Sequence, residues 1–325
     1  MERQMTLSDM EYGNVKKRTR REEFLETMDE IVPWGRFCEI VEPHYYKNKT
    51  GRKAKEIETM LRMLHLQIWF SLSDELTEEG IYDSRAMHNF MKIDFLTQSA
   101  PDATTLCNFR NLLQRHGLHK KFQAEINLLL ERRGLVMHGG TITDATIMPA
   151  SSSTRNASKS RDPEMASTKK GKNYHFGMKA HTGVDAGSGA VVGTSYTAAN
   201  EHDITQAEHN YRDDDHSRYG DSAFLGVEKR MKERDGDRVV NYHINKRPSQ
   251  RTERHDYPLN WEKHIESRKA ARRWMAEYPF YIVKRIFGCD RAIYRGIDKN
   301  AARFDLAFTS ANLYMFRHRL RPSLA

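Results

Sequence analysis

A chain of 325 residues is long enough for a sizeable hydrophobic core and for two domains. Its 53 lysines and arginines against 44 acidic residues give a formal net charge of +9, which favours a polyanionic partner, nucleic acid first. Without an apolar run of about eighteen residues or an apolar leader, we expect neither a membrane span nor secretion. Three widely spaced cysteines, Cys38, Cys107 and Cys289, suit neither a disulfide framework nor a zinc site, which favours a reducing cytoplasm.

The first part of the chain predicts helices. A basic run at residues 16–21 is followed by apolar residues at helical spacing over 24–31, and a stronger core-facing pattern covers 56–72. Two shorter helices are expected within 74–95. The basic run suits phosphate contacts, although a solvated basic helix would show the same pattern.

Pro101 and Asp102 supply a start signal for a further helix. Its outer side carries Thr, Asn and Arg side chains, as in the helix that a helix-turn-helix module offers to the major groove. The connection before Asp102 is longer than the usual turn of such a module. A helix over 118–133 then ends at Gly134. We expect residues 1–136 to form an all-helical DNA-binding domain, and the DNA contacts predicted from this helix are Thr104, Thr105, Asn108 and Arg110.

After Gly139 the sequence turns to β-branched strands. Three strands, with a Ser- and Lys-rich loop over 151–172 after the first, form a meander, and helices and strands then alternate. This order is typical of an α/β ribonuclease-H-like fold, a mixed sheet flanked by helices whose first and fourth strands are neighbours. We expect residues 137–325 to form this catalytic domain, with strands at 141–147, 174–184, 190–196, 213–221 and 239–244 and helices from 203, over 224–233 and from 261.

Three acidic residues stand out by position: Asp144 within the first strand, Asp221 at the end of the fourth, and Glu277 on the late helix. The ribonuclease-H-like order would bring them together. Carboxylates without Cys or His suit Mg²⁺ or Mn²⁺, and two such ions support an in-line phosphoryl displacement. Clustered acids repel, so their pKa values should be raised until metal binds. Taken singly, each acid is more often a cap or a surface charge.

Glu277 lies in a helical stretch between cationic side chains. Arg273, four residues before it, and Lys284, seven after it, share its helical face, which suits a metal-holding carboxylate beside two phosphate-holding cations. A solvated helix laced by ion pairs would show the same spacing. Pro279 should kink or restart the helix, which would move Lys284 off that face. Trp274 is expected to pack in the core.

Further basic side chains are candidate phosphate contacts. Four lie on or beside the second strand, where ordinary loop charge is an equally good reading, and two follow the fifth strand. His181 is expected to be structural. Asp213–Asp215 should form a solvated loop, because consecutive acids do not share a face. The candidate contacts are Lys169, Lys170, Lys172, Lys179, Lys246 and Arg247.

Several blocks, in this order, resemble a known family. The sequence is similar to the DDE transposases of bacterial insertion sequences, specifically the insertion-sequence-five group. The resemblance covers almost the whole chain, and the ordered set is far more specific than any single block. The blocks are DATTLCNFR (102–110), GTITDAT (140–146), RDPEM (161–165), HFGMKAH (175–181), TAANEHD (197–203), GDSAFLG (220–226) and the Arg273/Glu277/Lys284 helix followed by FG (287–288).

The resemblance implies that Asp144, Asp221 and Glu277 form a catalytic triad binding two Mg²⁺ or Mn²⁺ ions per active site. It implies that the N-terminal domain recognises the terminal inverted repeats of the element. The reaction would hydrolyse the phosphodiester at each end and join the freed 3′-OH to target DNA. Because two ends must be held together, a homodimer or higher assembly on double-stranded DNA is expected, in the cytoplasm at the nucleoid.

Two features depart from the family pattern. Ala270 stands where the wider superfamily has a Tyr, and Tyr219 is the only large apolar residue among the eight before Asp221. Buried strands are usually apolar, so the strand before Asp221 should be frayed. That weakness motivates an alternative function, a catalytically inactive or repurposed DNA-binding protein derived from a transposase. A host nuclease of the same fold is a third reading.

Overall fold

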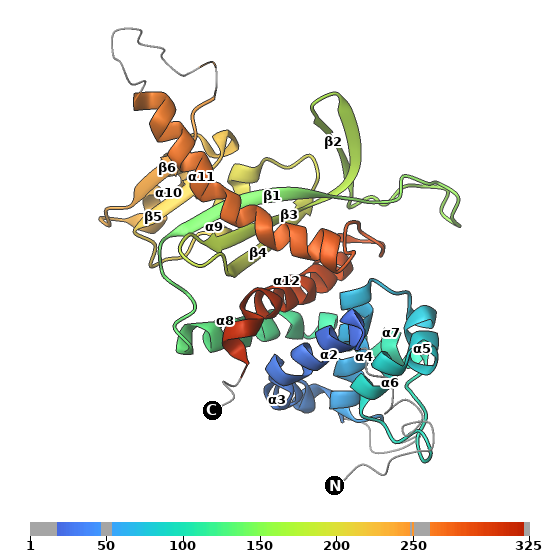
Figure 1. Ribbon diagram of the computed structural model, residues 1–325. Helices are drawn as coiled ribbons and strands as arrows, with labels where there is room; N and C mark the ends of the chain where they lie inside the picture. The colour runs from blue at the N-terminus through green and yellow to red at the C-terminus, as the bar shows by residue number, and fades with distance from the viewer. Residues whose placement is uncertain (1–17, 47–53, 248, 250–260, 322–325) are drawn as a thin grey trace.

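The computed structural model describes residues 18–46, 54–247, 249 and 261–321. Within them, a group of N-terminal helices lies on one side of the long helix α12 (Ile297–Leu320), and a mixed sheet lies on the other (Figure 1). Helix α12 packs against α8 and strand β4, and one hydrophobic core cluster draws residues from both sides, including Leu64, Met178 and Phe308. No helix of the described part is long and apolar enough to cross a membrane.

The expected N-terminal helices are present, and the one at 57–70 is buried over almost its whole length, with Arg62, His65 and Gln67 among its buried apolar residues. One helix, over residues 34–45, was not predicted, and it continues past Pro43, a residue that usually ends a helix. Burial of Trp34, Phe37 and Val41 outweighs the hydrogen bond that Pro43 cannot make. The helices are α2 (Arg20–Ile31), α3 (Trp34–Tyr45), α4 (Ile57–Phe70), α5 (Asp74–Asp83), α6 (Arg85–Met91), α7 (Ala103–Arg115) and α8 (Leu118–Arg132).

The sheet has the expected mixed topology. Its order is β2-β3-β1-β5-β6, with β4 also pairing β3. The pairs formed by β3 are antiparallel, whereas β5 runs parallel to both β1 and β6. The predicted first and fourth strands are therefore neighbours, as in the ribonuclease-H-like fold. The strands are β1 (Thr141–Pro149), β2 (Ala166–Lys170), β3 (Asn173–Asp185), β4 (Val191–Ala198), β5 (Ser217–Gly220) and β6 (Asn241–Ile244).

The prediction of a loop throughout 151–172 is wrong for its last part. Residues 166–170 form β2, which pairs with the start of β3 from Ala166↔Gly177 to Lys170↔Asn173. The resulting hairpin projects from the sheet (Figure 1). Its Ser, Thr and Lys side chains are half-buried or exposed, so no apolar alternation marks the strand in the sequence.

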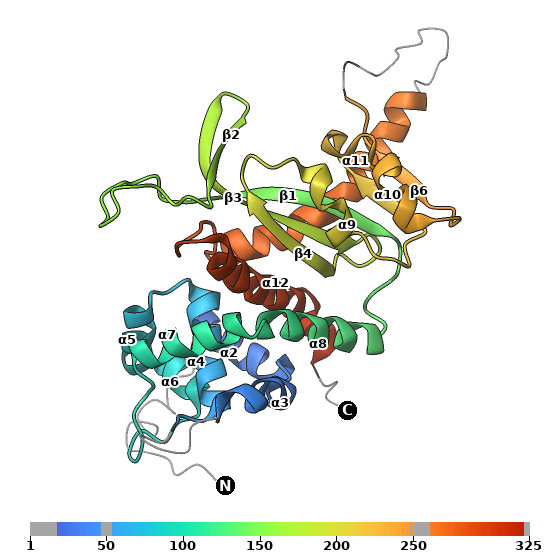
Figure 2. The same cartoon turned by 180° about the vertical axis from the view of Figure 1, so that it is seen from behind.

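Helices cover both faces of the sheet. Helix α11 crosses one face, and α9 and α10 lie on the other (Figures 1 and 2). A short 3₁₀ turn precedes α9, as another follows β5. These elements are η1 (Asp203–Gln206), α9 (Ala207–Asn210), η2 (Ser222–Phe224), α10 (Val227–Asp235) and α11 (Trp261–Tyr281).

Pro279 affects the end of α11 differently from the expectation. The helix runs two residues past it and then widens into a π-helical turn, η4 (Ile282–Ile286), which carries Lys284. A π turn adds a residue to the helical repeat and so rotates the side chains that follow it. The simple seven-residue spacing from Glu277 to Lys284 therefore does not describe where the lysine points.

The strand before Asp221 is formed, so the expectation of a frayed strand is wrong. Arg218 of β5 is fully buried, and its guanidinium donates to Asp235 at 2.7 Å, to the Tyr242 hydroxyl at 2.7 Å and to the Arg212 carbonyl at 3.2 Å. A buried, hydrogen-bonded ion pair takes the place of the apolar side chain expected at this position.

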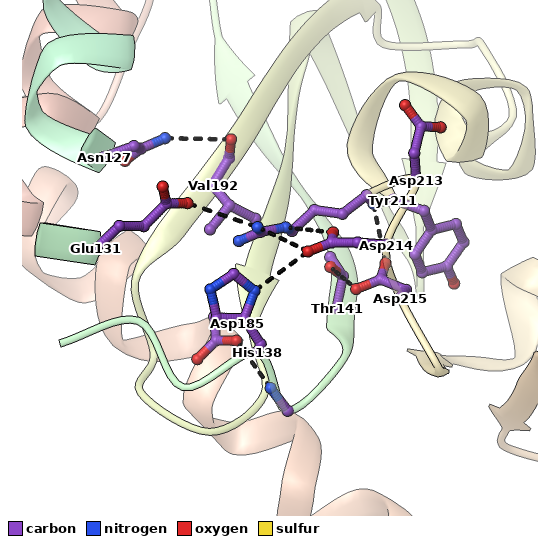
Figure 3. Close-up of polar contacts among 12 residues, drawn as sticks. Asn127, Glu131, His138, Thr141, Asp185, Val192, Tyr211, Asp213, Asp214 and Asp215 are labelled. Atoms are coloured by element: carbon purple, nitrogen blue, oxygen red, sulfur yellow. Dashed lines mark hydrogen bonds and ion pairs between the residues drawn. The ribbon is translucent and has the colours of Figure 1, made fainter. Parts of the chain in front are cut away.

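The acidic run before β5 is not a uniformly solvated loop. Asp215 is buried and accepts hydrogen bonds from the Thr141 hydroxyl at 2.8 Å and the Arg212 amide at 2.9 Å. Asp214 binds the Arg212 guanidinium and His138, as Figure 3 shows. Asp213 and Asp214 are exposed as expected, although Asp213 too forms an ion pair, with Arg234 of α10. These contacts tie the linker before β1 to the loop before β5.

Candidate active site

Strands β1 and β5 bring Asp144 and Asp221 to the same level of the sheet. Their last paired residues are Ile142 and Tyr219, and each acid follows two residues later along the chain, Asp144 within β1 and Asp221 directly after the end of β5. Side chains at equal positions of neighbouring parallel strands project to the same face. Strand β5 ends at Gly220, whereas β1 continues to pair with β3. The two carboxylates therefore lie where the pairing between β1 and β5 ends.

Local hydrogen bonds hold both carboxylates. Asp221 caps the turn η2, where its Oδ1 accepts the Ala223 amide at 2.8 Å. Oδ1 of Asp144 accepts the amide of Ala145 at 2.9 Å. Asp221 is half-buried. Each side chain is thus oriented by its own backbone near the open edge of the sheet.

Glu277 of α11 lies within electrostatic reach of this pair. Burial is the main cause that raises the pKa of Asp144 to about 6, and the charges of Asp221 and Glu277 raise it further, while the Ala145 amide and Arg273 oppose the shift. Glu277 itself is exposed. Three carboxylates thus share one field, and added positive charge would relieve their repulsion.

The donor chemistry suits a hard divalent cation, since carboxylate oxygens are the ligands that Mg²⁺ and Mn²⁺ prefer. In the described residues, however, no three His, Cys, Asp or Glu side chains lie close enough to hold a metal ion between them. The acids therefore fit a metal by their chemical type and mutual repulsion, and Glu277 is the most exposed of the three.

Arg273 lies beside the acids. Its Nη1 donates to Oδ1 of Asn245 at 3.2 Å, and its charge lowers the pKa of Asp144. Its buried Nε has no hydrogen-bond acceptor within the described residues. A buried charged donor without an acceptor is costly, so this nitrogen is suited to an anionic ligand. Asn245, which follows β6, was not singled out in the sequence because no motif marks it.

Lys284 contacts β1 just beyond Asp144. Its Nζ donates to the Thr146 hydroxyl at 2.7 Å and to the Ile147 carbonyl at 2.8 Å. Burial lowers its pKa, and the nearby charges of Lys170 and Arg285 lower it further. The π turn thus places this ammonium against the strand that carries Asp144.

Two family models match the chain. The model described as Transposase DDE domain matches residues 137–313, more than half of the chain, and the model described as Transposase domain (DUF772) matches residues 13–112. The chain belongs to the DDE transposase family. The predicted membership in the insertion-sequence transposases is thereby confirmed, whereas the insertion-sequence-five group stays a prediction. No solved structure matches the chain.

The other basic residues singled out near the transposase's acids differ in exposure. Three of them, Lys169, Lys170 and Lys172, are exposed on the β2–β3 hairpin. Lys179 is instead engaged by the protein, where it donates to the Glu201 carbonyl at 2.6 Å and to Asp203 at 2.9 Å. Beyond β6, Lys246 and Arg247 are exposed and follow Asn245, the partner of Arg273.

His181 is structural, in agreement with the prediction. It is buried beside β4, its Nε2 lies 2.8 Å from the Thr197 hydroxyl, and burial lowers its pKa to about 4. The imidazole is therefore neutral at physiological pH and is no candidate for acid–base chemistry.

In the helical part of the transposase, the residues predicted on α7 separate into two groups. Thr104 and Asn108 are exposed, and Thr105 and Asn108 border an open depression of about 280 Å³ with Lys55. Arg110 points inward, where it pairs with Asp74 through two contacts of 2.6 and 2.9 Å. Its guanidinium also lies over the ring of Tyr294 at 4.7 Å and donates to Gln67. Arg110 is therefore occupied by structural contacts.

Trp274 contradicts its predicted place in the core. Its side chain is 62% exposed on α11, one turn before Glu277. The buried face of the helix is formed instead by Ala276 and Phe280, four residues apart. The spacing of Ala276 and Phe280 was the signal that could have placed Trp274 outside.

Proposed function

We propose that this transposase binds the terminal inverted repeats of an insertion sequence, hydrolyses the phosphodiester bond at each end and joins the freed 3′-OH to target DNA. The observation that supports the proposal best is that Asp144 and Asp221 each lie two residues beyond the same register pair of two neighbouring parallel strands. Acids placed in this way fit phosphoryl transfer assisted by divalent metal.

Asp144, Asp221 and Glu277 would hold two Mg²⁺ or Mn²⁺ ions. When bound, such ions neutralise the carboxylates, lower the pKa of the attacking water and stabilise the leaving oxygen. The contribution of the chain is to fix two of the acids on a rigid sheet edge and to leave the third on an exposed helical face. Oxygen ligands of this kind suit hard cations better than softer metals, which prefer Cys and His ligands.

Cationic side chains would hold the DNA phosphates around this site. Arg273 offers a buried donor beside Asp144, and Lys284 offers its charge beside β1. The exposed lysines of the β2–β3 hairpin and the pair after β6 would extend the contact along the duplex. This second group is Lys169, Lys170, Lys172, Lys246 and Arg247.

The bonds change in two steps. In the first, water attacks the phosphorus at the element's end, the bond from phosphorus to the 3′ oxygen breaks, and that oxygen takes up a proton to leave a 3′-OH. In the second, this hydroxyl loses its proton and attacks a phosphorus of target DNA, whose own 3′ oxygen leaves. One phosphodiester is thus exchanged for another, and no external energy source is required.

The helical part would read the inverted repeats. We propose residues 1–136 as this domain and residues 137–325 as the catalytic domain, with Thr104, Thr105 and Asn108 as contacts to DNA. Their support is the exposed or half-buried polar face of α7 and the formal net charge of +9. Because both ends of an element react together, we propose a homodimer or a higher assembly on the DNA of the nucleoid.

A cleavage assay on inverted-repeat DNA tests the proposal. Asp144→Asn, Asp221→Asn and Glu277→Gln should each reduce Mg²⁺-dependent cleavage by at least about 10²-fold, since even a residue that only orients a metal ligand costs 10- to 100-fold. Binding of the same DNA should persist and should weaken steeply with salt. Normal cleavage by a variant would remove that residue from the site.

The alternative is a catalytically inactive or repurposed DNA-binding protein. The weak apolar pattern before Asp221 favoured it, but β5 is formed and pairs with both neighbours. Repeat-specific binding without nicking under Mg²⁺ or Mn²⁺ would support this alternative over catalysis. Cleavage that needs no repeats and joins no ends would instead indicate a nuclease.

A further inference from the structure

A basic hollow lies between strands β5 and β6 and the first half of α11. Its volume is about 380 Å³, within the range of pockets that hold small-molecule ligands. Tyr219 of β5 and His243 of β6 are register partners, and their rings stack with centroids 4.7 Å apart and 18° between their planes. This ring pair forms the sheet side of the hollow. The helix side is formed by His264, Ile265, Arg268, Lys269 and Arg272.

Two arginines of the hollow carry charge that the protein does not compensate. Arg268 and Arg272 lie four residues apart, on one face of α11, where like charges repel each other. Neither forms an ion pair with a residue that the structure describes, and the Arg272 guanidinium lies over the Tyr219 ring at 5.9 Å. Lys269 differs, since its ammonium donates to Oε1 of Glu266 at 2.8 Å. The two guanidinium groups are therefore suited to an anionic ligand, and their planar donors fit phosphate oxygens.

The positive charge of the hollow reaches the ring pair. His243 is half-buried, and burial lowers its pKa, while the charges of Lys269 and Arg272 lower it further. The imidazole is therefore neutral at physiological pH and offers an uncharged ring for stacking. Because β6 is the last strand on this side of the described sheet, no strand lies beyond this ring.

The combination of rings and uncompensated arginines narrows the chemistry of the ligand. Inorganic phosphate would engage the arginines but leave Tyr219 and His243 without a partner. Duplex DNA would do the same, because its phosphates lie outside while its bases are paired and stacked inside the double helix. A free nucleotide carries both a flat aromatic base and phosphates. The exposed Ile265 adds an apolar contact for the base.

We propose that this hollow binds a free nucleotide, whose base packs against the ring pair and whose phosphates bind Arg268 and Arg272. Tyr219 lies two residues before Asp221, roughly 7 Å along the strand. An occupied hollow would place phosphate charge beside the carboxylates, where it repels the phosphates of DNA, and should slow cleavage. This consequence rests on the proposed function, whereas binding of the nucleotide does not.

Equilibrium dialysis of the full-length protein against ATP, in the presence of EDTA, tests the site apart from cleavage. ATP should bind at least about tenfold more tightly than adenosine or inorganic triphosphate, because each of these lacks one part of the contacts. Arg268→Gln, Arg272→Gln and His243→Ala should each weaken the binding of ATP about tenfold. His243→Phe keeps an aromatic ring and should keep the affinity. Arg132→Gln is the matched control, because Arg132 is also an exposed arginine of a helix but lies on α8.

A second measurement follows His243 in the wild type. ATP should raise the pKa of His243 in an NMR titration, because its phosphates offset the charges of Lys269 and Arg272 that lower this pKa. The measurement needs no substitution, so its result does not depend on the folding of a variant. An unchanged pKa of His243 at saturating ATP would place the nucleotide outside the hollow.

Three binding results would overturn the proposal. They are a wild type that binds no ATP, an inorganic triphosphate that binds as tightly as ATP, and an unchanged affinity for ATP in both arginine variants. A duplex or an oligothymidine that loses more affinity than ATP in the Arg272→Gln protein would assign the arginines to DNA. Cleavage of element ends by a wild type that binds no ATP would remove the proposal and leave the proposed function. Binding of ATP by a protein that does not cleave would do the reverse.

Discussion

Asp144 of β1 and Asp221, which directly follows the parallel strand β5, each lie two residues beyond the register pair Ile142↔Tyr219. This equivalence has an energetic consequence. Burial is the main cause that raises the pKa of Asp144 and so disfavours its ionised form, and the charges of Asp221 and Glu277 add to this effect. A protein that keeps a buried acid among other acids gives up stability, which is an expected property of a site made for a cation.

The first prediction concerns Asp144 and pH. Because its pKa in the folded protein is about 6, above the usual 3.8, the folded state holds more protons than the unfolded state between these values. The contribution of Asp144 to the stability of the folded protein should therefore be greatest below pH 4 and should be lost as pH rises through 6. Asp144→Asn should raise the free energy of unfolding at pH 7.5 by about 1–3 kcal/mol, as measured by urea denaturation without metal.

The same variant tests the metal. Mg²⁺ should raise the melting temperature of the wild type and leave that of Asp144→Asn nearly unchanged, because binding to the folded state alone is stabilising. Asp213→Asn serves as the control, because Asp213 is exposed and precedes the start of β5, whereas Asp221 follows its end, so the variant should show the wild-type response. An Asp144→Asn protein that is less stable than the wild type at pH 7.5 would contradict the raised pKa of Asp144.

The second prediction concerns Lys284. Its ammonium donates to the hydroxyl of Thr146 and to the carbonyl of Ile147. Lys284→Ala should therefore lower the free energy of unfolding by about 1–3 kcal/mol, and it should also reduce cleavage. Lys284→Arg keeps the charge and should lose less. The exposed Lys172 is the matched control: Lys172→Ala should weaken DNA binding without any change in the urea midpoint. Equal midpoints for Lys284→Ala and Lys172→Ala would show that the contacts to β1 contribute little.

The third prediction concerns the polar strand β5. Arg218→Met removes the buried partner of Asp235 and should cost about 3–5 kcal/mol, because an unpaired buried charge remains. The double variant Arg218→Met with Asp235→Leu removes both charges and should recover much of that loss. The melting temperatures of the single and double variants test this prediction. A double variant that is less stable than the single one would show that the unpaired charge of Asp235 is not the cause of the loss.

The fourth prediction separates two neighbours on α7. Arg110→Ala breaks the two contacts with Asp74 and should lower stability by about 1.5–3 kcal/mol. Asn108→Ala, on the exposed face, should change stability by less than about 0.5 kcal/mol and weaken binding to inverted-repeat DNA. Urea denaturation measures the stability of both variants, and a DNA titration measures their affinity for inverted-repeat DNA. Loss of DNA affinity in a fully stable Arg110→Ala protein would return Arg110 to the DNA surface.

Most element positions could be predicted from the sequence, because apolar spacing is a local property. The pattern over 56–72 identified α4, and Asp102 identified the start of α7, whose Thr105 amide it caps at 2.7 Å. Strand β2 escaped prediction because its side chains carry no apolar alternation. Helix α3 was not predicted, and burial of one of its faces lets it continue past Pro43, a residue that usually ends a helix.

By itself, the sequence determined the order of helices and strands, the family and the three acids worth testing. The ordered blocks also predicted the DDE transposase domain that the family model confirms. Only the tertiary structure decided the surroundings of individual side chains. Lys284 meets Thr146 across 138 residues of chain, and Arg110 is paired within the helical core. Trp274 is left outside because Ala276 and Phe280 fill the contact with the core. Secondary structure follows from neighbours along the chain, whereas the partner of a side chain is selected by packing between segments far apart in sequence.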